Sequence, residues 1–128
     1  MLQEQAIPDS TLNVLKKISS LDFLSDFCLV GGTGLALYWG HRISVDLDFF
    51  TDKKVDLLYC EGKLNEIGKS HFLNRTPIAL FYSIDSVKCD FLIYPYPFSK
   101  PPLKEKAFQL AALDDIVTMK LGAITNRG

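Results

Sequence analysis

Two strand-like segments separated by only two residues restrict the fold of this chain more than any other feature. Residues 78–84 and 87–94 are rich in β-branched and aromatic residues, which favour strands. The Asp85-Ser86 pair between them is short enough for a tight hairpin, so we expect the two strands to be antiparallel. This pattern disfavours a doubly wound sheet in which every strand is parallel.

Helical patterns precede this hairpin. Apolar residues recur at helical spacing over residues 10–20, and Asp9 or Ser10 is the expected N-cap of that helix. The same spacing returns over residues 55–67, where Gly68 is the expected stop. Both segments therefore predict helices that pack one apolar side against the rest of the fold.

Further segments complete the predicted architecture. The apolar run at residues 27–30 is typical of a buried strand. Residues 33–39 predict a short helix closed by Gly40, and residues 113–124 predict another helix. The proline-rich residues 94–102 predict a loop. Together these patterns predict an α/β (α+β) fold, in which helices pack on a mixed sheet.

The overall composition narrows the class of protein. A length of 128 residues corresponds to one domain, which we place at residues 1–128. With 48% hydrophobic residues and a net charge of -1, the chain can bury a core but has no overall field that would attract a polyanion. No apolar run approaches the roughly 18 residues of a membrane span, and the N-terminus lacks a signal-peptide pattern. We therefore expect a cytoplasmic protein with no membrane partner.

The cysteines and histidines do not predict a metal or disulfide site. Cys28, Cys60 and Cys89 are widely spaced and form no CxxC pair, and His41 and His71 complete no zinc spacing. We expect buried free thiols, because a free cysteine behaves as a small hydrophobe.

Two acidic residues alternate with apolar ones from Ser44 onward. Asp46 and Asp48 would project from the same face of a strand, with Cβ atoms roughly 6–7 Å apart. Two anions this close repel each other unless a cation lies between them, and Mg²⁺ prefers carboxylate oxygens. The alternative is an ordinary strand with its acids on the solvent side.

Two other features fit a site around these acids. Gly31-Gly32 follows a predicted strand and precedes a predicted helix, where backbone N–H groups bind anions and glycine lets a phosphate approach; a plain turn is the alternative. A site with two metal ions usually needs a third carboxylate. Asp90 is the candidate because it lies in an otherwise apolar strand; the alternative is an exposed acid opposite Lys88.

This order of motifs resembles the nucleotidyltransferase superfamily that includes DNA polymerase beta. The superfamily signature is a hydrophobic residue with Gly-Gly or Gly-Ser, a spacer, and Asp-hydrophobic-Asp-hydrophobic, which this chain carries at residues 30–32, 33–45 and 46–49. More narrowly, residues 29–51 look like the AbiEii/AbiGii-type nucleotidyltransferase toxins. The Gly-His-Arg-x-Ser-x-Asp-x-Asp-Phe-Phe block is the most specific part, and KCDFLIYPYPF and LDDIVTMKLGAI look like later blocks of that family.

The resemblance implies a metal-dependent reaction. A nucleoside monophosphate would pass from a nucleoside triphosphate to an acceptor hydroxyl on RNA or protein, with release of pyrophosphate. Asp46, Asp48 and Asp90 would hold two Mg²⁺ ions, and Asp90 would also take the proton of the acceptor hydroxyl. Lys120 would neutralise phosphate charge. Without the resemblance, the alternative is an exposed lysine on a helix surface. The nucleotide would be bound by Gly31, Gly32, Thr33, Arg42 and Ser44.

The resemblance also implies a biological setting, the toxin of a bacterial toxin–antitoxin or abortive-infection system with an antitoxin protein as partner. Members of the family usually continue into a Lys-Asp-Phe-x-Asp motif and a helical C-terminal region, whereas this sequence ends at Arg127-Gly128. We therefore expect the core domain without that region. Two alternatives stay open: a non-catalytic nucleotide-binding or interaction module, and a small antibiotic-modifying nucleotidyltransferase.

Overall fold

The computed structural model describes residues 7–31, 37–38, 46–93, 102–104 and 108–110. Within these residues the chain forms one seven-stranded sheet with two α-helices and a 3₁₀ helix. The helices are α1 (Asp9–Ser19), η2 (Asp22–Asp26) and α3 (Leu57–Leu64). The strands are β1 (Cys28–Val30), β2 (Leu47–Thr51), β3 (Ser70–Thr76), β4 (Ala79–Ile84), β5 (Val87–Ile93), β6 (Leu103–Lys104) and β7 (Gln109–Leu110).

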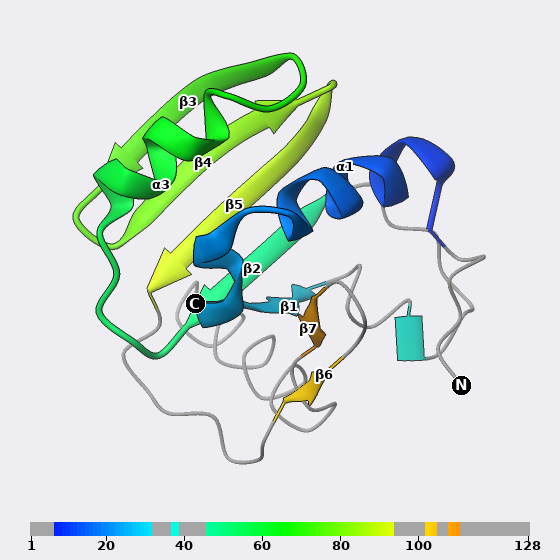
Figure 1. Ribbon diagram of the computed structural model, residues 1–128, viewed down its shortest axis with the longest axis horizontal. Helices are drawn as coiled ribbons and strands as arrows, with labels where there is room; N and C mark the ends of the chain where they lie inside the picture. Colours follow the sequence, from blue (N-terminus) through cyan, green and yellow to red (C-terminus); the bar gives the residue numbers. More distant parts are fainter. Residues whose placement is uncertain (1–6, 32–36, 39–45, 94–101, 105–107, 111–128) are drawn as a thin grey trace, which may run out of the picture.

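The sheet is mixed, as the sequence predicts. Its strand order is β3-β4-β5-β2-β1-β7-β6 (Figure 1). The pairs β2/β5 and β1/β7 are parallel, and the other neighbours are antiparallel. The β4–β5 hairpin is confirmed: Asp85 and Ser86 have φ of 49° and 69°, the positive values of a type I′ turn.

The described helices cover one face of this sheet (Figure 1). The ring of Phe91 on β5 lies 5.8 Å from that of Phe23 on η2 and stacks at 5.1 Å on that of Phe49 on β2. On β4, the hydroxyl of Tyr82 donates a hydrogen bond to Asn65 directly after α3. We call this side the helix-covered face. It carries the main core, because the apolar residues that alternate along β2, β4 and β5 point to it.

Both predicted helices form, but their ends differ from the prediction. The N-cap of α1 is Pro8, and neither Asp9 nor Ser10 caps it, because the Pro8 carbonyl accepts from Leu12 N at 2.9 Å and both residues fall in the first turn. Helix α3 is shorter than residues 55–67. It begins after Asp56, whose carboxylate accepts from the first free backbone N–H groups of the helix.

The C-terminal end of α3 also differs. The helix ends at Leu64, and Gly68, the expected stop, instead turns the chain toward β3 with φ of +50°. A side chain at Gly68 would meet the Asp85 carboxylate at 3.0 Å, so glycine fits this turn for two reasons.

All three cysteines are buried thiols, as predicted. Burial raises the pKa of Cys60 to about 12, so its thiol stays protonated and unreactive. In the part of the chain that the structure describes, no helix has the length and apolarity needed to cross a membrane. The predicted helices at residues 33–39 and 113–124 and the predicted loop at residues 94–102 lie outside the described residues, except for Leu37 and Tyr38, which are helical, and Pro102, which is in neither a helix nor a strand.

Candidate functional site

Strands β2 and β5 bring two of the predicted acids side by side. Asp48 and Asp90 are direct partners in the parallel register of these strands, whose axes run about 4.8 Å apart. Because Leu47, Phe49, Cys89 and Phe91 point to the helix-covered face, both acids point to the opposite face of the sheet. We call Asp48 and Asp90 the acid pair.

The glycine turn meets this pair. Val30 at the end of β1 pairs with Asp48, so Gly31 lies directly beside the acid. Gly31 has φ of +70°, and a Cβ atom built on it would lie 2.4 Å from Asp48 Oδ2. The carboxylate of Asp48 therefore occupies the space that any other residue at position 31 would fill.

Of the other predicted site residues, the structure describes only Asp46. Asp46 is exposed and precedes β2 by one residue. Gly32, Thr33, Arg42, Ser44 and Lys120 lie outside the described residues. The structure thus brings together Gly31, Asp48 and Asp90, with Asp46 next to them along the chain.

Burial and the charges of neighbouring acids keep the acid pair from ionising freely. Burial, followed by the charges of Asp90 and Asp46, raises the pKa of Asp48 to about 6. Burial also raises the pKa of Asp90, while the positive charge of Lys88 acts in the opposite direction. The pair is therefore a place where a bound cation would relieve an unfavourable charge.

The carboxylate of Asp90 has an unused acceptor. Its side chain is 16% exposed, and its Oδ1 atom is buried without a hydrogen-bond partner among the described residues. Its other oxygen, Oδ2, lies 3.8 Å from Lys88 Nζ. An orphaned buried carboxylate oxygen beside a second carboxylate is the type of donor set that a hard divalent cation takes.

Two ligands are what the described residues offer. Among them, no group of three or more His, Cys, Asp or Glu side chains is arranged to hold a metal ion. The acid pair can thus offer two carboxylates to a cation. Asp46, which is exposed, does not lie where it would be the third ligand of the same ion.

Lys88 is the site residue that the sequence motifs missed. The sequence offers Lys88 only as the neighbour of an exposed Asp90, whereas in the structure Lys88 forms an ion pair with Asp90 next to Asp48. The signal that could have found it is the two-residue spacing, which places Lys88 and Asp90 on the same face of β5.

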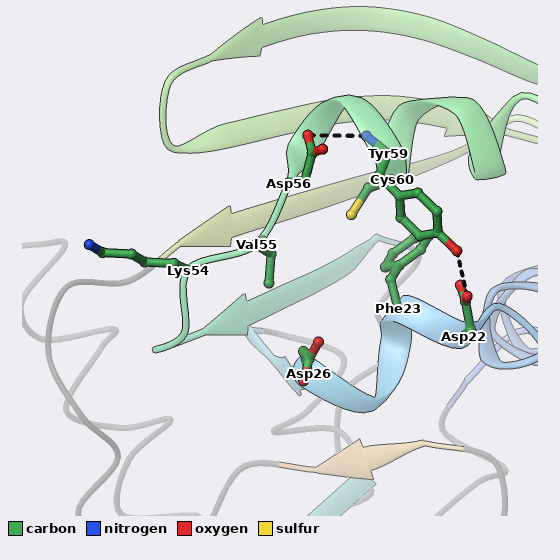
Figure 2. A pocket seen from close by; sticks show the side chains of 8 residues that line it. All are labelled: Asp22, Phe23, Asp26, Lys54, Val55, Asp56, Tyr59 and Cys60. Carbon is green, nitrogen blue, oxygen red and sulfur yellow. Dashed lines mark hydrogen bonds between the residues drawn. The ribbon is translucent and has the colours of Figure 1, made fainter.

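A cavity of about 340 Å³ opens elsewhere, between η2 and α3 (Figure 2). Two hydrogen bonds already use polar groups of its wall: Tyr59 Oη donates to Asp22 at 2.5 Å, and Asp56 accepts from the backbone N–H of Leu58 at 3.0 Å. Phe23 in its wall packs on Phe91 from the helix-covered face. None of the predicted site residues lines this cavity, so it is separate from the acid pair.

Comparison with known proteins decides the family. The family described as "Nucleotidyl transferase AbiEii toxin, Type IV TA system" matches residues 13–127. The chain belongs to the AbiEii family. This confirms the resemblance that the glycine and aspartate motifs predict, and it identifies the chain as a nucleotidyltransferase relative of the toxin–antitoxin type.

Individual proteins are also similar to this AbiEii family member. The uncharacterized protein aq_aa25 of Aquifex aeolicus is 35% identical over 118 residues, which are 89% of this chain and 57% of the relative. The crystal structure of JHP933 from Helicobacter pylori matches 90% of this chain and 57% of its own, with 21% identity and a TM-score of 0.58. This chain therefore spans little more than half the length of either protein.

A third protein, from Thermotoga maritima, is closer in length. It is assigned as a nucleotidyltransferase, and its crystal structure matches 94% of this chain and 90% of its own at a TM-score of 0.64 and 19% identity. At this level of identity the similarity concerns the fold alone. It confirms the mixed α/β architecture predicted for the AbiEii chain.

Proposed function

We propose that this AbiEii family member is a metal-dependent nucleotidyltransferase that moves a nucleoside monophosphate from a nucleoside triphosphate to an acceptor hydroxyl on RNA or protein. The observation that carries the proposal is the acid pair, in which Asp48 packs against Gly31 and Asp90 keeps a buried oxygen that has no partner in the described part of the chain. Family membership supports the reaction class, and the metal, the nucleotide and the acceptor are proposed.

The acid pair has the central role in this proposal. Asp48 and Asp90 would hold Mg²⁺, with Asp46 as a further ligand of the two expected ions. When bound, Mg²⁺ supplies charge neutralisation for the triphosphate and the departing pyrophosphate. Asp90 takes the proton of the acceptor hydroxyl while that oxygen bonds to the α-phosphorus, and the bond from the α-phosphorus to the bridging oxygen breaks to release pyrophosphate.

The glycine turn has the second role. Gly31 carries no Cβ atom, so the Asp48 carboxylate can pack directly against the turn, and backbone N–H groups of such a turn are proposed to bind phosphate oxygens. Gly32, Thr33, Arg42 and Ser44 are proposed to complete the nucleotide site, and Lys120 to neutralise phosphate charge. The proposed setting is the cytoplasm of a bacterium, where the chain acts as the toxin of a toxin–antitoxin or abortive-infection system with an antitoxin partner.

The test is transfer of label from each α-³²P nucleoside triphosphate to RNA and to protein, with Mg²⁺ or with EDTA. We expect label transfer only with Mg²⁺. Asp48→Asn and Asp90→Asn should each lower the rate by about 100-fold or more, because each removes a charge that the transition state needs. Asp52→Asn is the matched control, since Asp52 is an exposed acid directly after β2.

Other outcomes separate the alternatives. Calorimetry that detects nucleotide binding without any transfer would favour a non-catalytic module. Transfer to an aminoglycoside or another drug, and not to RNA or protein, would favour an antibiotic-modifying enzyme. Transfer that survives both acid-pair substitutions would overturn the assignment of the site.

A further inference from the structure

We infer that Lys88 regulates cation binding by the acid pair. Its ammonium group forms an ion pair with Asp90 and competes with a divalent cation for that carboxylate. The inference rests on the proposed function, because it concerns the same two carboxylates. It adds a residue that the family motifs do not assign.

The geometry of β5 places Lys88 at this position. Lys88 and Asp90 are two residues apart on the strand, so both side chains leave the same face of the sheet. Lys88 Nζ lies 3.8 Å from Asp90 Oδ2, which is within ion-pair distance but too long for a direct hydrogen bond. Lys88 can therefore leave Asp90 without the loss of a hydrogen bond.

Burial differs strongly between the two partners. The side chain of Lys88 is 56% exposed, whereas that of Asp90 is 16% exposed. The ammonium group is largely hydrated where it is, and it can move into solvent at little cost. Asp90 stays fixed in the sheet, where its Oδ1 atom has no partner among the described residues. In this ion pair, Lys88 can therefore be displaced by another cation, whereas Asp90 stays in place.

The balance of charge also favours replacement. Asp48 is the register partner of Asp90, and Asp46 lies two residues before Asp48, so the acidic groups near Asp90 outnumber the one ammonium group of Lys88. The charges of Asp46 and Lys88 both act on Asp90, in opposite directions. The net negative charge still attracts a divalent cation, but Lys88 offsets part of that attraction.

The test measures Mn²⁺ binding to the metal-free chain by calorimetry. Mn²⁺ alone is the probe, because it prefers the same oxygen ligands as Mg²⁺. Lys88→Gln should bind Mn²⁺ about two- to fivefold more tightly than the unaltered chain, the size expected for removal of one partly exposed ion pair. Lys88→Arg keeps the positive charge and should keep the original affinity.

Lys16→Gln is the matched control. Lys16 is an exposed lysine on α1, which covers the other face of the sheet. Removal of its charge should leave the Mn²⁺ affinity unchanged. An equal rise in affinity for Lys16→Gln would mean a general charge effect and would overturn the inference.

Two failures can be told apart. If the unaltered chain binds Mn²⁺ and Lys88→Gln binds it no more tightly, the role of Lys88 is wrong while the proposed metal site stands. If neither protein binds Mn²⁺ while circular dichroism shows both folded, the metal-dependent function and the role of Lys88 both fail.

Discussion

At position 48 the chain buries a carboxylate beside a second carboxylate and against a glycine. Its pKa is raised to about 6, mainly by burial. Between about pH 4 and pH 6 the folded chain therefore holds a proton on Asp48 that the unfolded chain has lost. The raised pKa of Asp48 therefore lowers the free energy of unfolding by about 2–3 kcal/mol as the pH rises through this window.

The first prediction concerns this residue. Asp48→Asn should raise the free energy of unfolding of the metal-free chain by about 1–3 kcal/mol at pH 8, because it removes the buried charge. The gain should shrink as the pH falls below 6 and should vanish well below pH 4, where Asp48 is protonated in both states. Urea unfolding in EDTA at pH 5 and pH 8 measures it.

Asp52→Asn serves as the control, because Asp52 is exposed. It should change stability by less than about 0.5 kcal/mol at both pH values. A variant Asp48→Asn that is less stable than the original chain at pH 8 would contradict the account of Asp48 as a buried, unfavourable charge.

Gly31 is the second residue on which the site depends. Its φ of +70° disfavours any side chain, and a Cβ atom would collide with Asp48 Oδ2. Gly31→Ala should therefore destabilise the chain by about 1–3 kcal/mol and displace the Asp48 carboxylate. Thermal unfolding measures the first effect, and loss of Mn²⁺ binding measures the second.

Gly62→Ala is the matched control for that substitution. Gly62 lies in α3, and a Cβ atom there would meet nothing within 4 Å. The same chemical change should stabilise the chain by up to about 1 kcal/mol, because alanine is the better helix former. Equal effects of the two substitutions would show that Gly31 has no special requirement.

At the scale of elements, the β4–β5 hairpin delivers Asp90 to the site. Its two-residue turn uses Asp85 and Ser86, both with positive φ. Asp85 is held there by the backbone N–H of Lys69 at 2.8 Å and by Lys17 at 2.5 Å. Ser86 adopts a left-handed conformation, with φ of 69°, that favours glycine.

We therefore predict that Ser86→Gly stabilises the chain by about 0.5–1 kcal/mol, because it relieves the left-handed conformation at the second turn position. Ser83→Gly, in the interior of β4, should instead destabilise it by a similar amount, because glycine weakens a strand. Chemical unfolding of both variants distinguishes the turn effect from a general effect of glycine. Destabilisation by Ser86→Gly would argue against the type I′ turn.

At the scale of the whole molecule, one aromatic cluster joins the elements behind the acid pair. Phe91 is fully buried and contacts Phe23, Phe27 and Phe49, with ring centroids 5.1–5.8 Å apart. It is the next residue after Asp90 and points to the opposite face of β5. The cluster thus holds β2 and β5 together at Phe49 and Phe91, which directly follow Asp48 and Asp90.

The last prediction follows from this cluster. Phe91→Ala should lower the free energy of unfolding by about 3–5 kcal/mol, because it leaves a large cavity in the core. Phe72→Ala makes the same change at a side chain that is 47% exposed on the edge strand β3, and it should cost much less. Denaturant titration of the two variants measures the difference, and similar losses would contradict the assigned core.

The sequence alone determined those features that depend on residues close together along the chain. The hairpin at Asp85-Ser86, the alternation along residues 47–51 and the burial of the cysteines could all be predicted, because period and turn chemistry act between near neighbours. The glycine and aspartate motifs also pointed to the AbiEii family, which the comparison confirms.

Only the tertiary structure decided which of these residues meet. The register of β2 against β5 puts Asp48 beside Asp90, and the end of β1 brings Gly31 onto Asp48. Such register depends on how whole strands and helices pack their apolar faces, and no local period encodes it. The two-residue spacing already puts Lys88 on the same face of β5 as Asp90, but only the register of β2 against β5 puts that ion pair beside Asp48.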